Sequence, residues 1–284
     1  MPKTLYVIDG HSQIHRAYHT KMRGLTAPGG EPTKAVYLFC KMLFGLVRSQ
    51  RPDYLALAMD TKREKLLRRK WFPRYKLNRV QSLPGLVDQI KLIHRIVELL
   101  GIPVLKVTGY EADDVMATLT RQARRSDPPI DVVLITKDKD AHQLIRGGGP
   151  EVRLFDPKES TYFTKRDVFN KWGLWPSQMI DFQTMAGDTT DGVPGVRGIG
   201  PKTARKLLKR YGSLQSIMDH IGDLPNNVAQ MLDTADLELA RKLVTLEQRL
   251  DLGVEMDDLV YRGIDTRRVR PLFRKLGFRR WANW

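Results

Sequence analysis

The stretch LYVIDG at residues 5–10 decides how this chain folds. Its four apolar residues, 5–8, are typical of a short buried strand, and the strand signal ends at Asp9. The same pattern recurs in YLALAM (54–59), IPVLKV (102–107) and DVVLIT (131–136), with helical patterns between these segments. Apolar strands that alternate with helices predict an α/β domain around a parallel sheet with both faces covered.

The second part of the chain has a different pattern. Strand signals largely stop after Pro176, where the sequence becomes helical apart from a glycine-rich turn, GVPGVRGIG, at 192–200. We therefore expect an α/β domain over 1–178, a mostly helical module over 179–264 and a basic C-terminal tail over 265–284. Helices are expected at 12–22, 33–49, 85–100, 111–125, 176–186, 201–210, 213–220, 225–233 and 235–246.

Acidic residues follow every predicted strand. The carboxyl ends of parallel strands share one edge of the sheet, where ligands bind. Seven carboxylates should meet there: Asp9, Asp60, Glu111, Asp113, Asp114, Asp138 and Asp140. One Asp after a strand is usually a helix cap, but seven like charges repel one another unless a cation neutralises them. Oxygen ligands without Cys or His favour Mg²⁺ or Mn²⁺, and two such ions about 3.5–4 Å apart suit phosphoryl transfer.

Two more acids, Asp188 and Asp191, stand directly before the glycine-rich turn. Alone they are typical of turn or cap residues, but their position favours a place in the same metal site. The turn itself leads into a helix with Pro201 at its first position. Free N–H groups behind such a turn bind phosphate, and the arginines and lysines that follow add positive charge. We interpret GVPGVRGIGPKTARKLLKRYG as a helix-hairpin-helix that grips the DNA backbone, with a plain helical hairpin as the alternative.

The charge of the chain agrees with such a partner. Lys and Arg total 48 against 32 Asp and Glu, which gives a formal charge of +16 and a pI near 10.0. This excess favours nucleic acid over a membrane surface, with a merely soluble basic protein as the alternative. The single cysteine, Cys40, lies in an apolar pattern and is expected to be buried. No signal peptide or membrane span is evident, so we expect a cytoplasmic protein.

Segment 62–79 (KREKLLRRKWFPRYKLNR) carries nine basic residues and one acid, with three aromatic residues among them. This composition suits contact with phosphates and splayed bases, and a solvated helix face is the alternative. His11, His15 and His19 recur every four residues but lack the spacing of a metal site, so we expect structural or solvent-facing roles. No phosphate-binding loop of the G-x-x-x-x-G-K-[ST] type is present, which argues against an ATP-driven motor.

Together these motifs resemble the 5′-nuclease family that includes the N-terminal domain of bacterial DNA polymerase I and the flap endonucleases. IDGHSQIHRAYH is similar to the family's V-D-G-x-x-x-x-x-R-A-Y-H, GYEADDV to its E-A-D-D core, and TKDKD to its T-G-D-K-D turn. AMDTK, LRRKWFPRYKLNR and MAGDTTDGVPGVRGIGPKTA also match family segments. Two departures stand out: Lys137 replaces a common Gly, and Gly192 replaces a common Asn.

The resemblance implies a PIN-like nuclease domain with a helical arch near 62–95, followed by a helix-hairpin-helix (H3TH) module. It assigns one divalent ion to Asp9, Asp60, Glu111, Asp113 and Asp114 and a second to Asp138, Asp140, Asp188 and Asp191. Arg68, Tyr75, Lys76 and Arg79 fall at catalytic arch positions. The DNA-binding positions of the hairpin are Gly195, Arg197, Gly198, Gly200, Lys202, Thr203, Arg205 and Lys206. The family also holds K⁺ in the hairpin.

The resulting hypothesis is a Mg²⁺- or Mn²⁺-dependent 5′→3′ exonuclease with structure-specific flap endonuclease activity, acting by a two-metal mechanism. Its expected partner is DNA with 5′ ends, flaps or branches, bound by a monomer, with a DNA polymerase acting in trans. Two rival hypotheses remain: a branched-DNA-binding module without catalysis, and a PIN-type nuclease that acts on RNA.

Overall fold

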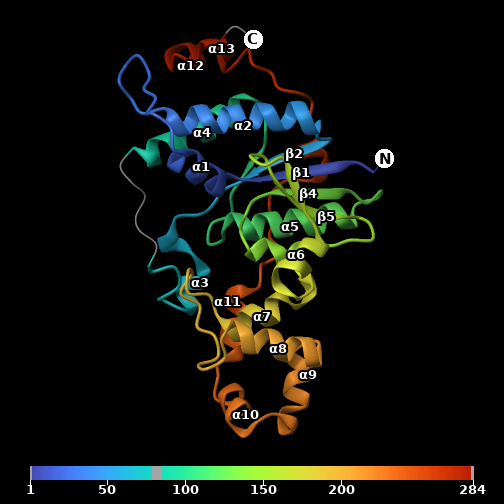
Figure 1. Cartoon of the computed structure of the whole chain (residues 1–284). Helices are drawn as coiled ribbons and strands as arrows, with labels where there is room; N and C mark the ends of the chain where they lie inside the picture. The colour runs from blue at the N-terminus through green and yellow to red at the C-terminus, as the bar shows by residue number, and fades with distance from the viewer. Residues whose placement is uncertain (1, 79–84, 283–284) are drawn as a thin grey trace.

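A six-stranded sheet forms the centre of the molecule. The computed structural model describes residues 2–78 and 85–282, and its strands lie in the order β3-β2-β1-β4-β5-β6 (Figure 1). The first five strands are parallel and β6 is antiparallel to β5. The strands are β1 (Thr4–Asp9), β2 (Tyr54–Ala58), β3 (Val104–Leu105), β4 (Asp131–Ile135), β5 (Val152–Asp156) and β6 (Thr161–Phe163). The parallel α/β sheet predicted from the apolar runs is confirmed.

The sequence patterns do not predict β5 or β6, and β3 is shorter than expected. β5 and β6 were not predicted, because VRLFD and TYF mix polar with apolar residues and lack the apolar run of a central strand. The run 102–107 contributes only two residues to β3, at the edge of the sheet. Its neighbour Pro103 uses its carbonyl to accept from the Leu57 N–H (2.9 Å) but has no N–H to continue a ladder.

Helices cover both faces of the sheet, as parallel strands require. One face packs against α1 (Gly10–His19), α2 (Lys34–Gln50) and α4 (Leu86–Leu99), and the other against α5 (Ala112–Arg125) and α6 (Lys165–Trp172) (Figure 1). Cys40 is fully buried on α2, as predicted. Short helical turns η1 (Arg63–Lys65), α3 (Leu67–Trp71) and η2 (Asp140–Leu144) lie beside the carboxyl ends of the strands.

The helical module continues the core of the sheet domain. It comprises η3 (Pro176–Gln178), α7 (Met179–Ala186), α8 (Pro201–Tyr211), α9 (Leu214–Asp219), η4 (Ile221–Asp223), α10 (Asn226–Asp233) and α11 (Leu237–Val244). Buried residues of α7, α8 and α9 belong to the same hydrophobic cluster as those of α5 and β4. A boundary at residue 178 remains a prediction, since the apolar core runs across it.

The described residues after 255 return to the sheet domain. After η5 (Met256–Leu259), the backbone at Val260 bridges to Tyr54 on β2. Two short helices, α12 (Arg270–Lys275) and α13 (Arg279–Ala282), then cover α2 through Phe273 and Trp281, which contact the ring of Phe44. The basic tail expected at 265–284 is thus a packed cap over its described part. None of the described helices is long and apolar enough to span a membrane.

Candidate active site

The first acids of the site lie where β1 and β2 end. Asp9 is 6% exposed and caps α1 by accepting from the N–H of Ser12 (3.0 Å), while Thr136 donates to its other oxygen (2.8 Å). Asp60 accepts from the N–H of Ala112 (2.8 Å), which ties β2 to the start of α5. The helix-cap and cluster interpretations therefore both hold for Asp9, because one carboxylate serves both purposes.

Three further acids belong to the start of α5. Glu111 and Asp114 form a capping box around this helix N-terminus. Asp113, between them, lies close enough to Asp138 and Asp9 for their charges to raise its pKa. Its Oδ1 is buried and has no hydrogen-bond partner among the described residues. A buried carboxylate oxygen without a donor is the kind of atom that a cation satisfies.

A second group of acids joins the sheet domain to the helical module. Oxygens of Asp140, Asp188 and Asp191 lie within 4.8 Å of one another. The chain reverses tightly here, with a backbone bridge between Asp188 and Val193. Gly192 has φ +69°, in the left-handed region that Gly and Asn adopt most readily. The family's Asn at this position and the Gly of this chain thus satisfy the same backbone requirement.

Burial and mutual repulsion perturb the acids of both groups. Burial, together with the charges of Asp60 and Asp138, raises the pKa of Asp9 to about 7. Burial, with Asp138 and Asp191, raises the pKa of Asp140 to about 7. The pKa of Asp113 is raised well above its ordinary range by burial and by the charges of Asp138 and Asp9. These groups lack sufficient positive charge from the protein to keep all of them ionised at neutral pH.

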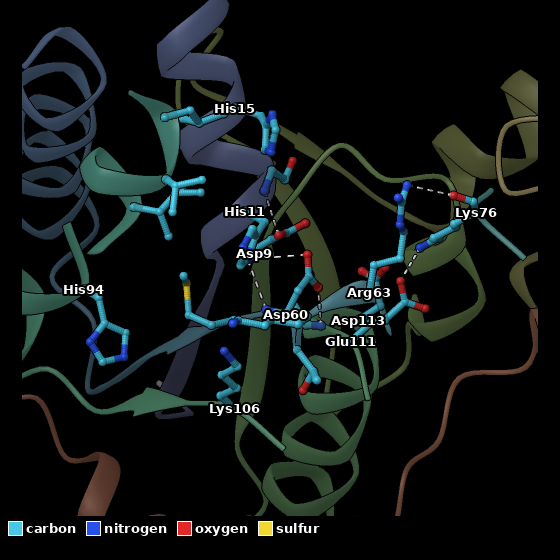
Figure 2. A pocket seen from close by; sticks show the side chains of 18 of the residues that line it. Asp9, His11, His15, Asp60, Arg63, Lys76, His94, Lys106, Glu111 and Asp113 are labelled. Carbon is cyan, nitrogen blue, oxygen red and sulfur yellow. Dashed lines mark hydrogen bonds and ion pairs between the residues drawn. The ribbon is translucent and has the colours of Figure 1, made fainter. Parts of the chain in front are cut away.

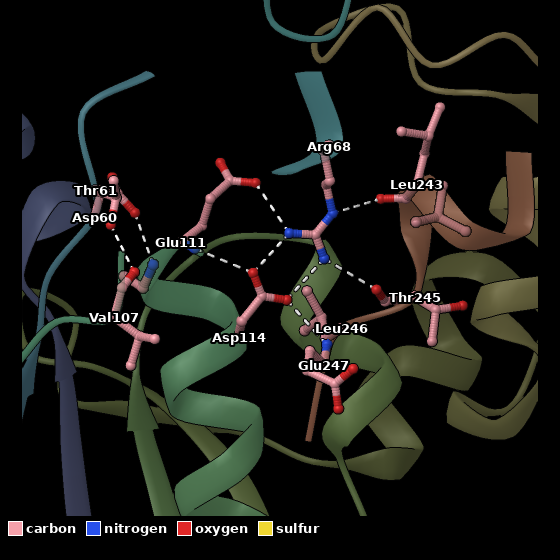
Figure 3. A network of polar contacts seen from close by, with 12 residues as sticks. Asp60, Thr61, Arg68, Val107, Glu111, Asp114, Leu243, Thr245, Leu246 and Glu247 are labelled. Carbon is pink, nitrogen blue, oxygen red and sulfur yellow. Dashed lines mark hydrogen bonds and ion pairs between the residues drawn. The ribbon is translucent and has the colours of Figure 1, made fainter. Parts of the chain in front are cut away.

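A neighbouring set of acids is paired instead with Arg68, which is 6% exposed (Figure 3). Its guanidinium donates to both oxygens of Asp114 (2.6 and 2.7 Å) and to Glu111 (3.3 Å). It also donates to the backbone carbonyls of Leu243 and Thr245, both 3.0 Å away. Burial alone would lower the pKa of Arg68, but the hydrogen bonds to Asp114 hold it above its ordinary value.

Asp114 was predicted to be a metal ligand, but its carboxylate is occupied by other partners. It is fully buried, and its oxygens also accept from the N–H groups of Glu111 (3.1 Å) and Glu247 (2.9 Å). The structure directs this carboxylate to Arg68 rather than to Asp9 and Asp113. Arg68 likewise lies inside the protein, bridging α3, α5 and the end of α11, so its predicted contact with the DNA strand stays a prediction.

Tyr75 and Lys76 are buried as well. The Tyr75 hydroxyl donates to Glu111 (2.8 Å). The Lys76 ammonium forms an ion pair with Glu111 (Figure 2) and another with Asp191 (3.2 Å). Burial would raise the pKa of Glu111, but the charges of Lys76 and Arg68 lower it. Lys76 has φ +52°, and its N–H donates to the Asp191 carbonyl (2.8 Å). This unusual conformation carries its side chain to the junction of the two acidic groups. Arg79, the fourth predicted arch residue, lies outside the described residues.

The acids at the strand ends line a cavity of about 1160 Å³ (Figure 2): they are Asp9, Asp60, Glu111, Asp113 and Asp138. The rest of the lining includes imidazoles, lysines and apolar side chains of α1 and α4. His11 belongs to both parts of the lining, because its Nδ1 accepts from the Asp60 N–H (3.1 Å) and lies 3.4 Å from the Asp60 carboxylate. The histidine repeat of α1 was expected to be structural or solvent-facing, and the structure places it along this cavity.

The hairpin residues lie at the start of α8, with Gly200 as its N-cap and Pro201 at its first position. Gly195 packs directly against the backbone of 185–187, where an added Cβ would lie 2.4 Å from the Gly187 nitrogen. Gly198 has φ +90°. Most of the predicted DNA contacts are open to solvent, with Thr203 and Arg205 half-buried: the exposed members are Arg197, Gly198, Gly200, Lys202 and Lys206.

Some functional neighbours gave no sequence signal. Gln183 donates to Asp140 (2.5 Å), and Lys139 pairs with Asp188 (2.9 Å), which connects β4 to the turn after α7. Single polar residues in a helix or turn carry no pattern that indicates such partners. Only the placement of Lys139 between two acids of one motif hints at a role.

The residues present fit divalent cations. All candidate ligands are carboxylate oxygens, which Mg²⁺ and Mn²⁺ prefer. The unpartnered Oδ1 of Asp113 and the raised pKa values of Asp9 and Asp140 indicate that positive charge is missing from this set. The ligands would be Asp9, Asp60, Asp113, Asp138, Asp140, Asp188 and Asp191, with Glu111 at the edge of the set.

Known structures share this fold. The T5 D15 protein crystallised with metal ions superposes with a TM-score of 0.71, covering 87% of this chain and 90% of that one at 20% identity. Flap endonuclease-1 from Methanococcus jannaschii superposes with a TM-score of 0.58 at 16% identity, over 99% of this chain and 90% of that one. At these identities the likeness establishes the fold, a PIN-like sheet domain followed by a helical module.

Sequence relatives are closer. A "5′-3′ exonuclease" of Aquifex aeolicus is 36% identical over 96% of this chain and 92% of its own length. DNA polymerase I of Thermus aquaticus is 34% identical over 96% of this chain, which spans 32% of that polymerase. Two family models match: the 5′-3′ exonuclease N-terminal resolvase-like domain over residues 4–173 and the 5′-3′ exonuclease C-terminal SAM fold over 174–267. The chain therefore belongs to the 5′-3′ exonuclease family.

Proposed function

We propose that this protein is a divalent-metal-dependent 5′→3′ exonuclease that also cuts 5′ flaps from DNA. The observation that carries the proposal is the set of buried and half-buried carboxylates around Asp113, whose buried Oδ1 has no hydrogen-bond partner among the described residues. Such a set fits two Mg²⁺ or Mn²⁺ ions, and bound ions of this kind activate water and stabilise the leaving oxygen in phosphodiester hydrolysis.

The residues of the chain have distinct tasks in this proposal. Asp9, Asp60 and Asp113 hold one ion from the strand ends, and Asp140, Asp188 and Asp191 hold the other across the domain junction. Lys76 reaches the space between the two groups through Glu111 and Asp191. Its ammonium is placed to contact the scissile phosphate once DNA competes for it, and there it stabilises negative charge that grows during cleavage.

DNA duplex would be held by the turn and N-terminus of α8. Its backbone N–H groups and Lys202 face solvent and contact phosphates without reading bases. We also propose that K⁺ binds backbone carbonyls of the turn at 195–200. The protein would act as a monomer in the cytoplasm, with a DNA polymerase in trans. Support for DNA as substrate comes from neighbours of the same fold that were solved with DNA.

The test is cleavage of a 5′-labelled flap duplex by the purified protein with Mg²⁺, with Mn²⁺ or with EDTA, beside the variant Asp138→Asn. We expect cuts near the branch with either metal and none with EDTA or in the variant. A matched control is Asp131→Asn, an acid at the opposite end of β4 that accepts from the Glu151 N–H. Tight binding without cutting under either metal would overturn the proposal in favour of a DNA-binding module, and faster cutting of RNA flaps would favour the RNA nuclease.

A further inference from the structure

The active-site cavity has a second wall that the proposed function leaves unused. It is made by α1, α4 and the end of β3, and it consists of His11, His15, His19, Lys91, His94 and Lys106. We call these residues the imidazole wall. Figure 2 shows His15 above Asp9 and His94 to the left of Asp60, with Lys76 and Arg63 to the right. The cavity thus offers carboxylates to cations and, away from Lys76, N–H donors to an anion.

The wall is ordered by the start of α1. Because this helix begins directly after Asp9, residues 11, 15 and 19 follow one another at four-residue spacing along a single face, about 6 Å apart. The rings of His15 and His19 are stacked, with centroids 6.2 Å apart. The imidazoles form a row that begins at Asp60 and leads away from the acids.

The lysines and His94 are accessible to a ligand. Lys91 pairs with Asp88 (3.1 Å) and His94 with Glu98 (3.5 Å), but both are half-exposed or exposed pairs within one helix. Such pairs contribute little and exchange readily. Lys106 is exposed on the same side of the cavity. One further acid, Glu64, lines the cavity without belonging to the candidate metal ligands.

The positions of α8, α1 and α4 indicate which part of a DNA strand reaches the imidazole wall. Figure 1 shows α8, where the duplex would bind, in the lower part of the molecule and α1 and α4 in the upper part, with α5 and α7 between them. A strand that places its scissile phosphate at the acids therefore carries its 5′ side toward α1 and α4. Apolar residues 86, 87 and 90 of α4 line the same space and suit a sugar or base face.

We propose that the imidazole wall binds the terminal 5′-phosphate of the strand being degraded, so that the enzyme prefers 5′-phosphorylated ends. This inference rests on the proposed nuclease function. The cavity volume of about 1160 Å³ exceeds the roughly 300–1,000 Å³ of ordinary small-ligand sites, so one or two nucleotides fit between the acids and the wall. A long flap extends beyond the cavity and keeps its 5′-phosphate away from the wall.

The experiment compares single-turnover cleavage of nicked duplexes whose downstream strand ends in 5′-phosphate or in 5′-hydroxyl, with a long-flap duplex beside them. We expect the phosphorylated end to be cut roughly ten-fold faster. The double variant His15→Ala/His19→Ala should bring this ratio close to one and lose less activity on the long flap. Lys41→Ala, which removes an exposed lysine from α2 outside the cavity, should keep the wild-type ratio.

A binding measurement protects the test against loss of folding. The single variant His15→Gln keeps a polar side chain of similar size, and binding of the dinucleotide pdTpdT in EDTA should weaken relative to wild type, while dTpdT binds poorly to both. Equal cleavage of phosphorylated and hydroxyl ends by the wild type would overturn the inference and leave the nuclease function standing. If the wild type cuts none of the three duplexes with any metal, the proposed function itself fails.

Discussion

Two groups of buried carboxylates lie side by side in this protein and are neutralised in different ways. Asp114 and Glu111 are matched by Arg68 and Lys76, which the chain itself supplies. Asp9, Asp113 and Asp140 have raised pKa values because burial and neighbouring acids outweigh the cations near them. The first group holds three parts of the chain together, whereas the second is left short of positive charge. Within one motif, an acid that faces a cation of the protein has a structural role, and an acid that faces other acids is a candidate metal ligand.

The difference also explains why one motif, E-A-D-D, contains both kinds. Glu111 is the N-cap of α5, and Asp113 and Asp114 are adjacent residues of its first turn, so these two side chains point in directions about 100° apart. Asp114 faces Arg68 and the backbone of Glu247, and Asp113 faces Asp138 and Asp9. Sequence proximity is therefore a poor guide to which of the two binds a metal ion.

The paired group should be sensitive to loss of its cation. Arg68→Ala leaves the Asp114 carboxylate buried without its partner, and breaking a buried pair costs about 3–5 kcal/mol. We expect a loss of this size in the free energy of unfolding, measured by urea denaturation. Arg69→Ala is the matched control, since the Arg69 side chain donates a long hydrogen bond to the Pro73 carbonyl (3.4 Å) at a half-exposed position. A loss below about 1 kcal/mol would mean that Arg68 is not needed to neutralise Asp114.

Lys76 pairs with Glu111 and also with Asp191, one of the acids before the glycine-rich turn. Its removal should separate binding from catalysis. We expect Lys76→Ala to slow single-turnover flap cleavage by about 10²–10³-fold, as the loss of one preorganised donor does. Flap binding in Ca²⁺ should change much less, because the proposed duplex-binding surface is at α8, away from Lys76. Lys70→Ala, an exposed lysine of the same segment, serves as control. Cleavage by Lys76→Ala at the wild-type rate would remove Lys76 from the catalytic residues.

The unpaired group should make the metal-free protein less stable as pH rises. The pKa of Asp9 is about 7 in the folded protein against 3.8 ordinarily, so the folded state binds more protons between these values. Stability should then fall from pH 5 to pH 7 by about 1–3 kcal/mol. The lowered pKa of Glu111 acts in the opposite direction only below about pH 4.5.

Urea denaturation in EDTA at pH 5, 6 and 7 measures this slope, and Asp9→Asn should flatten it. Mn²⁺ should reverse it, because the ion binds ionised carboxylates and stabilises the folded state. If the free energy of unfolding in EDTA instead increases from pH 5 to pH 7, cations of the protein itself neutralise these acids.

The smallest effect is expected at Lys137, which departs from the family's pattern. Its ammonium pairs with Asp156 (2.5 Å) at a half-exposed site, where Arg16 also donates to Asp156 (2.6 Å). Burial alone would raise the pKa of Asp156, but the hydrogen bonds from Arg16 and Lys137 lower it to about 2. Lys137→Gly should therefore change unfolding free energy by less than about 1 kcal/mol. A large fall in cleavage rate would instead assign Lys137 a phosphate contact.

Much of this arrangement follows from the sequence, and the rest needs the folded chain. The positions of Asp9, Asp60 and Asp138 follow from the rule that parallel strands end at one edge. The pairing of Arg68 with Asp114 cannot be predicted from the sequence. The two residues are 46 positions apart, and the sequence makes Asp113 an equally good partner. The strands β5 and β6 lack a periodic apolar pattern because tertiary contacts set their partners. The contact of Gln183 with Asp140 is set by tertiary structure in the same way.

The most direct test of the central claim is calorimetric titration of Mn²⁺ into the wild type, Asp113→Asn and Asp114→Asn, with unfolding measured in parallel. We predict that Asp113→Asn weakens Mn²⁺ binding about ten-fold or more while its unfolding free energy in EDTA holds or rises. Asp114→Asn should show the opposite: lower stability, with Mn²⁺ affinity within about three-fold of wild type where it remains folded. Mn²⁺ binding that survives Asp113→Asn and disappears in folded Asp114→Asn would contradict the division of these acids.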